Sequence, residues 1–463
     1  MKHIFTFILS VLLLAAAALK AEEPDLPAGL EEQSEPDLPA GLDSSAGSAE
    51  SGITAGTLEP AAVEFSFSGF LEGRYGRRLH SDPLQKDESI GEGRAQFELD
   101  TEWEQLSSTV VTDFVYDPVL DDYTQDFESG SGVLDLREAN FLYRAGDYAD
   151  IKLGRQILTW GTGDLVFIND LFPKDWNSFF IGRDEEYLKA PSDAVKFSLF
   201  NSLLNLDIVY TAAFDADRYI DGRRVSFFDP SVNGMIAFKQ GLPVDRRASW
   251  FSEDELALRL YRQFGSYEAA LYYYNGYWKS PAGSQNGLAT FPALSVYGGS
   301  LRGPLSGGIL SLEGGYYDSR DDIAGRDPLV RNSEYRFLIG YEHELFRNFT
   351  AAFQFYHEGM RHFKRYRDSF PAGSGLRPQD RSLITVRLTY LLFNQNLRLS
   401  LFNFYSPQEK DGYLRLNSNY KVSDNWRVEA GANIFYGQDR SSFFGQFKDA
   451  ANVYIALRWS FEH

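Results

Sequence analysis

The sequence contains no cysteine among its 463 residues. This absence excludes disulfide bonds, thiolate metal sites, covalent haem attachment and cysteine nucleophiles, and it removes the residue through which a lipoprotein is anchored. The chain also has no internal run near the ~20 apolar residues that a transmembrane helix requires. Strands of a membrane β-barrel alternate apolar and polar residues and average out to a polar score. A membrane location through strands therefore stays open.

Histidine is scarce, and this bears on catalysis. The six histidines are His3, His80, His343, His357, His362 and His463. A membrane-embedded hydrolase or protease needs a His-centred nucleophile or an acid pair. Only His343 and His357 fall in neighbouring predicted strands, on the outward-facing parity and with no serine motif around them. We therefore expect no enzymatic activity and no cofactor, and a hydrolase barrel remains the disfavoured alternative.

Residues 1–21 have the pattern of a signal peptide. Lys2 and His3 precede an apolar core, Ile4 to Ala18, and small residues follow as far as Ala21. This arrangement predicts export, with cleavage near Ala21. An uncleaved N-terminal membrane anchor is the alternative.

Basic residues are missing from the next stretch, 22–60, which is acidic and rich in Pro, Gly and Ser. The sequence Glu-Pro-Asp-Leu-Pro-Ala-Gly-Leu occurs there twice, at 23–30 and 35–42. Such a segment cannot bury a core, so we expect a disordered periplasmic tail. Two interpretations stay open: a solvated tail, or a repeated motif within 23–42 that binds a periplasmic protein. The net charge of −20 and the lack of a basic stripe predict no nucleic-acid partner.

Aromatic residues are abundant, with 27 Tyr and 37 Phe, and from Val63 onward apolar residues recur with period two. Alternation over ten or more residues is the pattern of a β-strand with one apolar and one polar face. We predict about 18 such strands, beginning near residues 63, 90, 107, 132, 148, 194, 203, 253, 266, 291, 307, 332, 348, 380, 395, 410, 425 and 450.

The connections between these strands alternate between short turns and long loops. That layout, with an even number of strands, is typical of an outer-membrane barrel, and closure leaves no strand edge exposed to lipid. The predicted fold class is all-β: a transmembrane antiparallel up-and-down β-barrel of about 18 strands in residues 61–463, with short periplasmic turns and long extracellular loops. A soluble sandwich or propeller is disfavoured because its strands are usually only ~5–6 residues long.

The last predicted strand ends in Trp459 and Phe461, followed by Glu462 and His463. An amphipathic terminal strand that ends in aromatic residues is the expected signal for the barrel-assembly machinery. We therefore predict two partners, that machinery and outer-membrane lipid, and a location in the outer membrane of a Gram-negative cell.

An 18-stranded barrel is too wide to be filled by strand side chains, so it encloses an aqueous channel unless something plugs it. Alternation assigns residues of both signs to the channel wall: Arg387, Arg398, Arg415, Arg427 and Arg458 from the last strands, Glu72, Glu98 and Asp100 from the first two, and Lys196. Closure brings the acidic and the basic wall together. Either they stiffen the wall by salt bridges, or they set up a transverse field that orients polar solutes.

The segment Ile151–Trp160 is predicted to form one strand, and its register poses a problem. If Ile151 and Leu153 face lipid, strict alternation turns Arg155 to lipid as well. An arginine at the bilayer midplane of a barrel costs ~2–4 kcal/mol. A bulge at Gly154 would shift the parity, so we expect Arg155 to line the pore.

The loop 161–193 is too long for an ordinary connection, which indicates function or disorder. Its charged and aromatic residues are the candidates for a constriction: Asp164, Asp170, Asp175, Trp176 and Arg183. Because apolar rings allow the loop to pack inside the barrel, we favour a loop that folds inward and narrows the pore. A lid over the extracellular mouth is the alternative.

The run Leu153–Gly161, Leu-Gly-Arg-Gln-Ile-Leu-Thr-Trp-Gly, followed by a long aromatic loop, carries a resemblance. It is similar to the Gly-Arg-Gln…Trp-Gly signature of uncharacterised outer-membrane porins of Gram-negative bacteria, loosely akin to the alginate-export type. The resemblance implies a channel for diffusion or export of polar solutes, with no catalytic residues. The arginine ladder favours anions and the acidic loops oppose them. An accessory channel for an inner-membrane export system is the alternative.

Overall fold

The computed structural model describes residues 63–370 and 377–462, which belong to one compact unit. The predicted signal peptide and the acidic tail with its duplicated motif lie outside the described residues. Within the described ranges, the helices are too short or too polar to cross a membrane.

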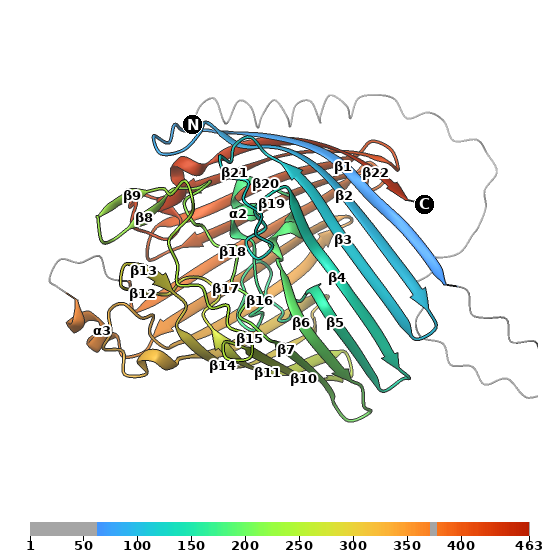
Figure 1. Cartoon of the computed structure of the whole chain (residues 1–463), viewed down its shortest axis with the longest axis horizontal. Coiled ribbons are helices and arrows are strands. Elements are labelled where there is room, and N and C mark those ends of the chain that lie inside the picture. The colour runs from blue at the N-terminus through green and yellow to red at the C-terminus, as the bar shows by residue number, and fades with distance from the viewer. Residues whose placement is uncertain (1–62, 371–376, 463) are drawn as a thin grey trace, which may run out of the picture. The chain divides into compact units, whose positions relative to one another are not determined.

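Eighteen strands form a single antiparallel sheet that closes on itself (Figure 1). Consecutive strands are paired, and β1 completes the circle by pairing with β22, from Ser68 opposite Glu462 to Arg78 opposite Asn452. The strands of the barrel are β1 (Glu64–Arg78), β2 (Glu88–Trp103), β3 (Leu106–Tyr116), β4 (Leu134–Ala145), β5 (Ala149–Ile157), β6 (Pro191–Leu199), β7 (Asn205–Thr211), β10 (Glu255–Phe264), β11 (Tyr267–Tyr277), β14 (Ala293–Leu305), β15 (Gly308–Ser319), β16 (Glu334–Phe346), β17 (Phe349–Met360), β18 (Asp380–Leu392), β19 (Leu397–Ser406), β20 (Asp411–Lys421), β21 (Trp426–Tyr436) and β22 (Asn452–Glu462).

The two ends of the barrel differ in their connections (Figure 1). Tight turns join the strands at one end, and three of them contain glycine with positive φ: Gly146 (+63°), Gly265 (+58°) and Gly307 (+83°). Long loops join the strands at the other end. The long loops contain two hairpins, two helices and three 3-10 turns: β8 (Phe227–Asp229), β9 (Gly234–Ile236), β12 (Gly283–Gln285), β13 (Leu288–Thr290), α2 (Trp176–Ile181), α3 (Phe363–Ser369), η1 (Glu185–Leu188), η2 (Arg320–Asp322) and η3 (Gly445–Ala450).

Alternation of side chains decides which face of the sheet turns outward. On β1, Phe65, Phe67 and Leu71 are exposed on the outer face, whereas Glu72 and Arg74 are buried inside. The apolar outer face suits a hydrocarbon environment, and the closed ladder satisfies the backbone hydrogen bonds that lipid cannot. The alternation of apolar and polar residues therefore fits a closed barrel whose outer face is apolar.

The predicted fold class and strand number are confirmed. Each predicted strand start falls within three residues of the observed one, and the largest difference is at β6, predicted from residue 194 and beginning at Pro191. One predicted strand end is wrong. The segment Ile151–Trp160 leaves the sheet after Ile157, because Pro191 ends the β5–β6 ladder there and Leu158 turns into the core.

Candidate functional site

The loop between β5 and β6, residues 158–190, runs inside the barrel, and Figure 1 shows its helix α2 surrounded by strands. Distant parts of the wall bind its backbone. Arg74 Nη1 of β1 donates to Gly182 O at 2.7 Å, and Asn452 Nδ2 of β22 donates to Phe180 O at 3.1 Å. From β15, the hydroxyl of Tyr317 donates to the carbonyl oxygen of residue 168. Loop β5–β6 therefore folds inward and does not form a lid.

Residues of the Gly-Arg-Gln…Trp-Gly run direct the chain from the wall into the lumen. Gly154 has a φ of +116°, and a Cβ at this position would overlap the carbonyl oxygen of Ala139 in β4. Trp160 packs edge-on against Phe172, with 4.9 Å between ring centres. The glycine allows close approach of two strands, and the tryptophan fastens the start of the loop to its own later turn.

Glu313 of β15 holds the first turn of loop β5–β6. Its carboxylate accepts hydrogen bonds from the backbone N–H groups of Thr162, Gly163 and Asn169 at 2.9, 3.1 and 2.7 Å. Gly161 has a φ of +84°, and a Cβ there would lie 2.9 Å from Glu313 Oε1. Hydrogen bonds to an ionised carboxylate are about twice as strong as neutral ones. A single wall residue thus fixes three points of the loop.

A patch of glycines on the wall admits the loop. It consists of two directly opposed pairs in β14 and β15: Gly298 with Gly315, and Gly299 with Gly314. A Cβ at Gly298 would overlap Oδ1 of Asn169, and one at Gly315 would lie 2.9 Å from a methyl group of Ile168. At Gly298 and Gly315 the side chains of the loop therefore lie closer to the sheet than a wall side chain would allow.

Helix α2 forms the apolar centre of the loop. Asp175 caps its N-terminus by accepting from Ser178 N at 2.7 Å. The rings of Phe179 and Phe180 pack against Tyr413 of β20, with centres 5.5 and 5.6 Å apart. The ends of the helix are thus fixed while its rings join the core on the wall.

Arg387 of β18 binds the loop at two separate points. Its Nη2 donates to Asp164 Oδ1 at 2.7 Å and to Glu185 Oε1 at 3.0 Å. Burial raises the pKa of Asp164 to about 6, although the charge of Arg387 opposes that shift. The Arg387 bridges join the beginning of loop β5–β6 to its end.

Salt bridges neutralise the seam where β22 meets β1. Arg458 lies opposite Glu72 in the ladder, with Nε 2.9 Å from its carboxylate, and it also reaches Glu186 of the loop at 3.2 Å. Arg74 pairs with Glu429 at 2.7 Å. Here the acidic and the basic wall bind each other, as the salt-bridge interpretation predicts.

The remaining wall residues assigned from the sequence are less engaged. Arg398 and Arg427 are exposed, and neither has an ion-pair partner among the described residues. Glu98 and Asp100 of β2 are half-buried and likewise pair with no cation within the described ranges. Lys196 lies 3.9 Å from a carboxylate of β7. These charges are less fully paired than those at the seam of β1 and β22.

The other loop residues predicted from the sequence maintain the loop's own shape. Asp170 pairs with Lys174 at 2.9 Å, both nearly fully buried. Arg183 binds Glu92 of β2 through Nε at 2.8 Å, and its backbone oxygen accepts from Arg415 of β20 at 3.1 Å. Arg415 therefore supports the loop as much as it lines the lumen.

The structure corrects the prediction for Arg155. The ladders of β5 with β4 and β6 have no register shift at Gly154, so Arg155 keeps the outer face that Leu153 occupies. Its guanidinium binds Asp193, directly opposite, and Glu128 of the β3–β4 loop, each at 2.9 Å. Two carboxylates neutralise this arginine on the outer face, so no bulge is needed to turn its side chain into the lumen.

A bulge does occur one strand earlier, at Arg137. The pairing of β3 with β4 skips this residue between Leu136 and Glu138. The Arg137 guanidinium lies 4.7 Å from the ring centre of Tyr187 and donates to Lys189 O at 3.0 Å. The arginine that a bulge aims at the loop is therefore Arg137.

The loop between β7 and β10, residues 212–254, is a second interior element, although its sequence predicts only a long connection. Arg218 N donates to Lys174 O at 2.8 Å, and Trp176 N donates to Arg218 O at 3.1 Å. The carboxylate of Asp217 accepts from Lys174 N at 2.8 Å and from Trp176 Nε1 at 3.2 Å. Loops β5–β6 and β7–β10 thus fold together.

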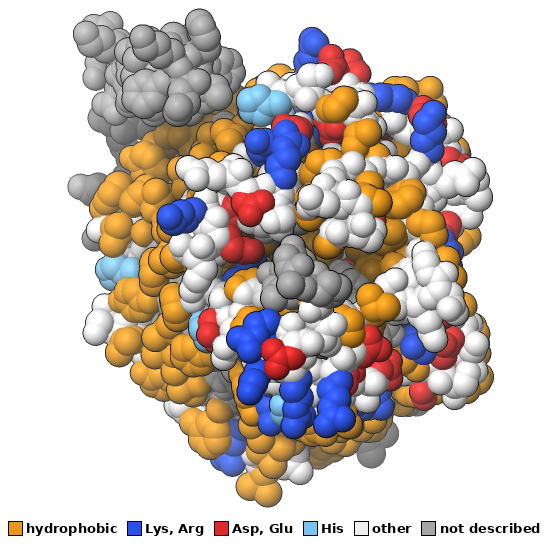
Figure 2. All heavy atoms as spheres, turned by 90° about the vertical axis from the view of Figure 1, so that its left-hand side faces the viewer, with side chains coloured by type: hydrophobic (Ala, Val, Ile, Leu, Met, Phe, Trp, Pro, Cys, Tyr) orange, Lys and Arg blue, Asp and Glu red, His pale blue; other side chains and the backbone are white. Residues whose placement is uncertain are grey.

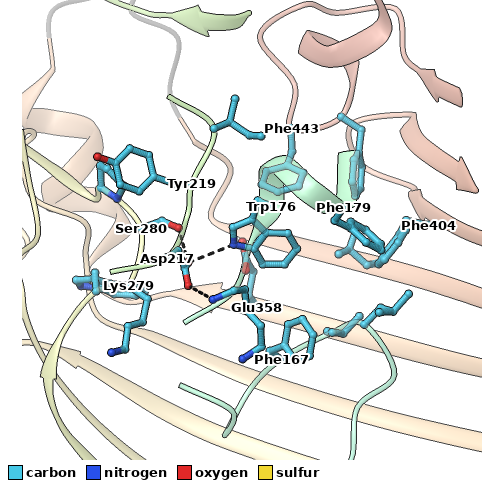
Figure 3. Close-up of a pocket in the computed structure, with 18 of the residues that line it drawn as sticks. Phe167, Trp176, Phe179, Asp217, Tyr219, Lys279, Ser280, Glu358, Phe404 and Phe443 are labelled. Atoms are coloured by element: carbon cyan, nitrogen blue, oxygen red, sulfur yellow. Dashed lines mark hydrogen bonds between the residues drawn. The ribbon is translucent and has the colours of Figure 1, made fainter. Parts of the chain in front are cut away.

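Two of the cavities beside loop β5–β6 differ in size and in lining. The upper cavity, on the long-loop side, has a volume of about 540 Å³, and Figure 3 shows aromatic rings and Asp217 around it. The lower cavity is small and polar, and it is lined by Asp184, Glu185, Arg387, Arg398 and Arg415 among others. The same strands line both, since β19 contributes Phe404 to the upper cavity and Phe402 to the lower.

The face formed by the long loops mixes charges of both signs (Figure 2). Lys and Arg side chains alternate there with Asp and Glu, and hydrophobic side chains cover the flank of the barrel. This face therefore presents no patch of a single sign.

His357 is the one histidine of β17, and it has a serine beside it that sequence reasoning missed. Its Nδ1 lies 3.1 Å from Ser382 Oγ, and its Nε2 lies 3.7 Å from Asp380. The Ser382 hydroxyl is buried and also accepts from Gln408 Nε2 at 3.0 Å. Neither cavity includes these residues. The cluster joins β17 to β18 and offers no accessible nucleophile.

No family model matches the chain, and no curated protein matches it. Solved structures do match in fold. OccD3 (OpdP) of Pseudomonas aeruginosa is 9% identical with a TM-score of 0.51, covering 87% of this chain and 92% of that one. OccAB4 of Acinetobacter baumannii is 11% identical with a TM-score of 0.52, covering 86% and 98%. OccK11 (OpdR) of Pseudomonas aeruginosa is 11% identical with a TM-score of 0.51, covering 88% and 98%.

At these identities the likeness is one of fold. It confirms at that level the resemblance to outer-membrane porins that the sequence suggests. The chain has the closed 18-stranded barrel fold of outer-membrane porins.

Proposed function

We propose that this protein is a channel of the Gram-negative outer membrane through which small polar solutes, anions in preference, diffuse past a constriction. The constriction is the gap between loop β5–β6 and the arginines of β18–β22. The observation that carries the proposal is the docking of this loop across the lumen by Arg387, while Arg398 and Arg427 have no carboxylate partner within residues 63–370 and 377–462.

Preference for anions follows from how the basic residues are spaced. Arg427 lies directly opposite Arg458 in the β21–β22 ladder. Like charges at such positions destabilise a sheet, and Glu72 compensates only Arg458. An anion beside Arg427 and Arg398 lowers this repulsion, whereas a cation finds Glu98 and Asp100 on the neighbouring side of the seam. The wall thus also has the transverse separation of charge that orients polar solutes.

Arg387 is the contact that a solute must pass. On β18, Leu383 lines the upper cavity and Arg387 the lower one. The carboxylates of Asp164 and Glu185 occupy its donors in the structure. An anionic solute competes with them for the guanidinium, so passage and selectivity depend on the same side chain.

The barrel surface supports the proposed surroundings. Exposed apolar residues such as Leu153, Phe353 and Leu457 lie on the outer faces of three strands, in keeping with lipid contact. We infer that β22, with Trp459 and Phe461 on the same face as Leu457, is the signal that the barrel-assembly machinery reads. We infer no enzymatic activity.

The proposal is tested in planar bilayers with the full-length protein in a salt gradient. The expected result is stable conductance, with a reversal potential whose sign shows that anions are more permeant than cations. Replacing both Arg398 and Arg427 by Gln lowers the anion-to-cation permeability ratio, whereas the control R262Q, on the outer face of β10, leaves it unchanged. A folded, heat-modifiable barrel without conductance contradicts the proposal.

A further inference from the structure

The upper cavity is built mainly from aromatic rings that come from separate parts of the chain. Phe167, Trp176 and Phe179 belong to loop β5–β6, Phe404 to β19 and Phe443 to the loop before β22. Figure 3 shows these rings around one space. Its volume of about 540 Å³ falls within the roughly 300–1,000 Å³ typical of small-molecule sites.

Cations line this cavity, but carboxylates already neutralise them. Each pair lies within 3.1 Å: Lys174 with Asp170, Lys279 with Glu255, Arg331 and Arg336 with Glu334, and Arg381 with Glu409. The lower cavity differs, because Arg398 has no such partner among the described residues. The upper cavity thus has no excess charge that calls for a counter-ion.

Three of these guanidinium groups also stack on rings of the same wall. Arg336 lies 3.7 Å from the ring centre of Tyr317, Arg331 lies 4.3 Å from that of Trp278, and Arg381 lies 4.2 Å from that of Phe443. Such stacking holds each guanidinium plane in place and presents flat surfaces to the cavity. The wall is therefore ordered for a flat ligand.

The polar groups of the cavity are largely satisfied as well. Asp217 accepts from Ser280 Oγ at 2.6 Å in addition to Lys174 N and Trp176 Nε1 (Figure 3). Burial raises the pKa of Asp217. Nη2 of Arg381, a residue of the same wall, is buried and has no hydrogen-bond partner among the described residues. Few polar groups of the cavity are therefore free for a ligand, so its rings provide most of the contacts that a ligand can make.

We propose that the upper cavity binds small aromatic molecules, and that it recognises the ring by stacking and not by charge. A neutral aromatic alcohol and an aromatic acid then bind alike, whereas a small acid without a ring does not bind. This goes beyond the proposed channel function, because it assigns a separate binding site with a different selectivity from the arginine wall.

Calorimetric titration of the detergent-solubilised full-length protein tests the proposal, with benzyl alcohol, benzoate and acetate as probes. The expected result is binding of benzyl alcohol and benzoate with affinities within about tenfold of each other, and no binding of acetate. Phe443→Ala weakens both ring ligands by roughly two- to tenfold, the range for loss of one aromatic contact. Phe353→Ala, on the outer face of β17, leaves both affinities unchanged.

Several results overturn the proposal: binding of acetate as tight as that of benzoate, binding of benzoate without benzyl alcohol, or equal effects of Phe443→Ala and Phe353→Ala. The measurement needs no transport, so its failure is distinct from failure of the channel function. A conducting barrel that binds no ring ligand refutes only the cavity. A silent barrel that binds both ring ligands refutes only the channel.

Discussion

The upper and lower cavities are built by the same strands and have opposite character. On β20, Tyr413 lines the aromatic upper cavity, and Arg415, two residues further, lines the polar lower one. Both side chains obey the same inward alternation. What separates them is loop β5–β6, which covers one level of the wall with rings and the next with Asp184, Glu185 and Glu186. A uniform barrel thus gains two compartments from one inserted loop.

Loop β5–β6 is attached to the wall by different kinds of contact on its upper and lower sides. On the upper side, Phe179 and Phe180 are almost fully buried against wall aromatics. On the lower side, Arg387 is bound to carboxylates that are about a third exposed. Apolar burial is insensitive to pH and salt, whereas partly exposed ion pairs are screened. The lower attachment is therefore the side that conditions and substitutions can release.

Removing the part of loop β5–β6 that separates the two cavities has the largest expected effect. Replacing residues 164–186 by a short Gly/Ser linker merges the two cavities, so single-channel conductance rises several-fold. Heat-modifiable migration on gels checks that the barrel is folded. A folded variant with the conductance of the natural protein would show that the loop does not limit the pore.

Breaking the lower attachment alone is the next test. Arg387→Gln removes the donors that hold Asp164 and Glu185, so we expect higher conductance, larger current fluctuations and weaker anion preference. The matched variant Arg427→Gln removes an equal charge that binds none of the loop residues that the structure describes, so it lowers anion preference without raising conductance. Equal conductance changes in the two variants would contradict a role for Arg387 in holding the loop.

Acidification releases the same contact reversibly and to a smaller extent. The raised pKa of Asp164, about 6, means that this carboxyl is mostly ionised above that pH and mostly neutral below it. Its ion pair with Arg387 is therefore lost as the pH falls through about 6, and conductance rises over the same interval. In Asp164→Asn the step at this pH is absent. If Asp164→Asn shows a conductance step of the same size and midpoint as the natural protein, a group other than Asp164 causes the step.

The glycine patch offers the smallest and most local test. Gly298→Ala places a methyl group where Asn169 lies, whereas the nearest atom to a Cβ at the adjacent Gly299 is 3.4 Å away. We expect Gly298→Ala to displace the start of loop β5–β6 and increase current noise, and Gly299→Ala to behave as the natural protein. Protease cleavage within the loop of the refolded barrel provides a second readout. Indistinguishable variants would show that the close approach has no role.

The sequence predicts the barrel well because period-two alternation is a direct consequence of a sheet with one face in lipid. It also identifies the arginine wall, since Arg387, Arg415 and Arg458 follow from parity. At Arg155 strict parity is right and the predicted bulge is wrong. The sequence does not indicate this outcome, because the carboxylates of Asp193 and Glu128 that accommodate the arginine on the outer face come from separate segments.

The sites where the loop docks depend on tertiary contacts that local patterns do not encode. One signal was available: the Gly-Gly pairs at 298–299 and 314–315 fall in consecutive predicted strands, which indicates close approach of another segment. The upper cavity had no such signal, because its rings come from at least four separate segments. Aromatic residues are also common throughout a barrel of this kind, so their number alone does not locate a site.

The division of the lumen by loop β5–β6 is tested most directly by thiol accessibility, because the chain has no cysteine of its own. Phe443→Cys reports on the upper cavity and Ser400→Cys on the lower one, each in a bilayer with a membrane-impermeant thiol reagent added to one side. We predict that Phe443→Cys reacts at least about tenfold faster from the long-loop side and Ser400→Cys at least about tenfold faster from the turn side. Equal rates from both sides for both variants would contradict a partitioned lumen.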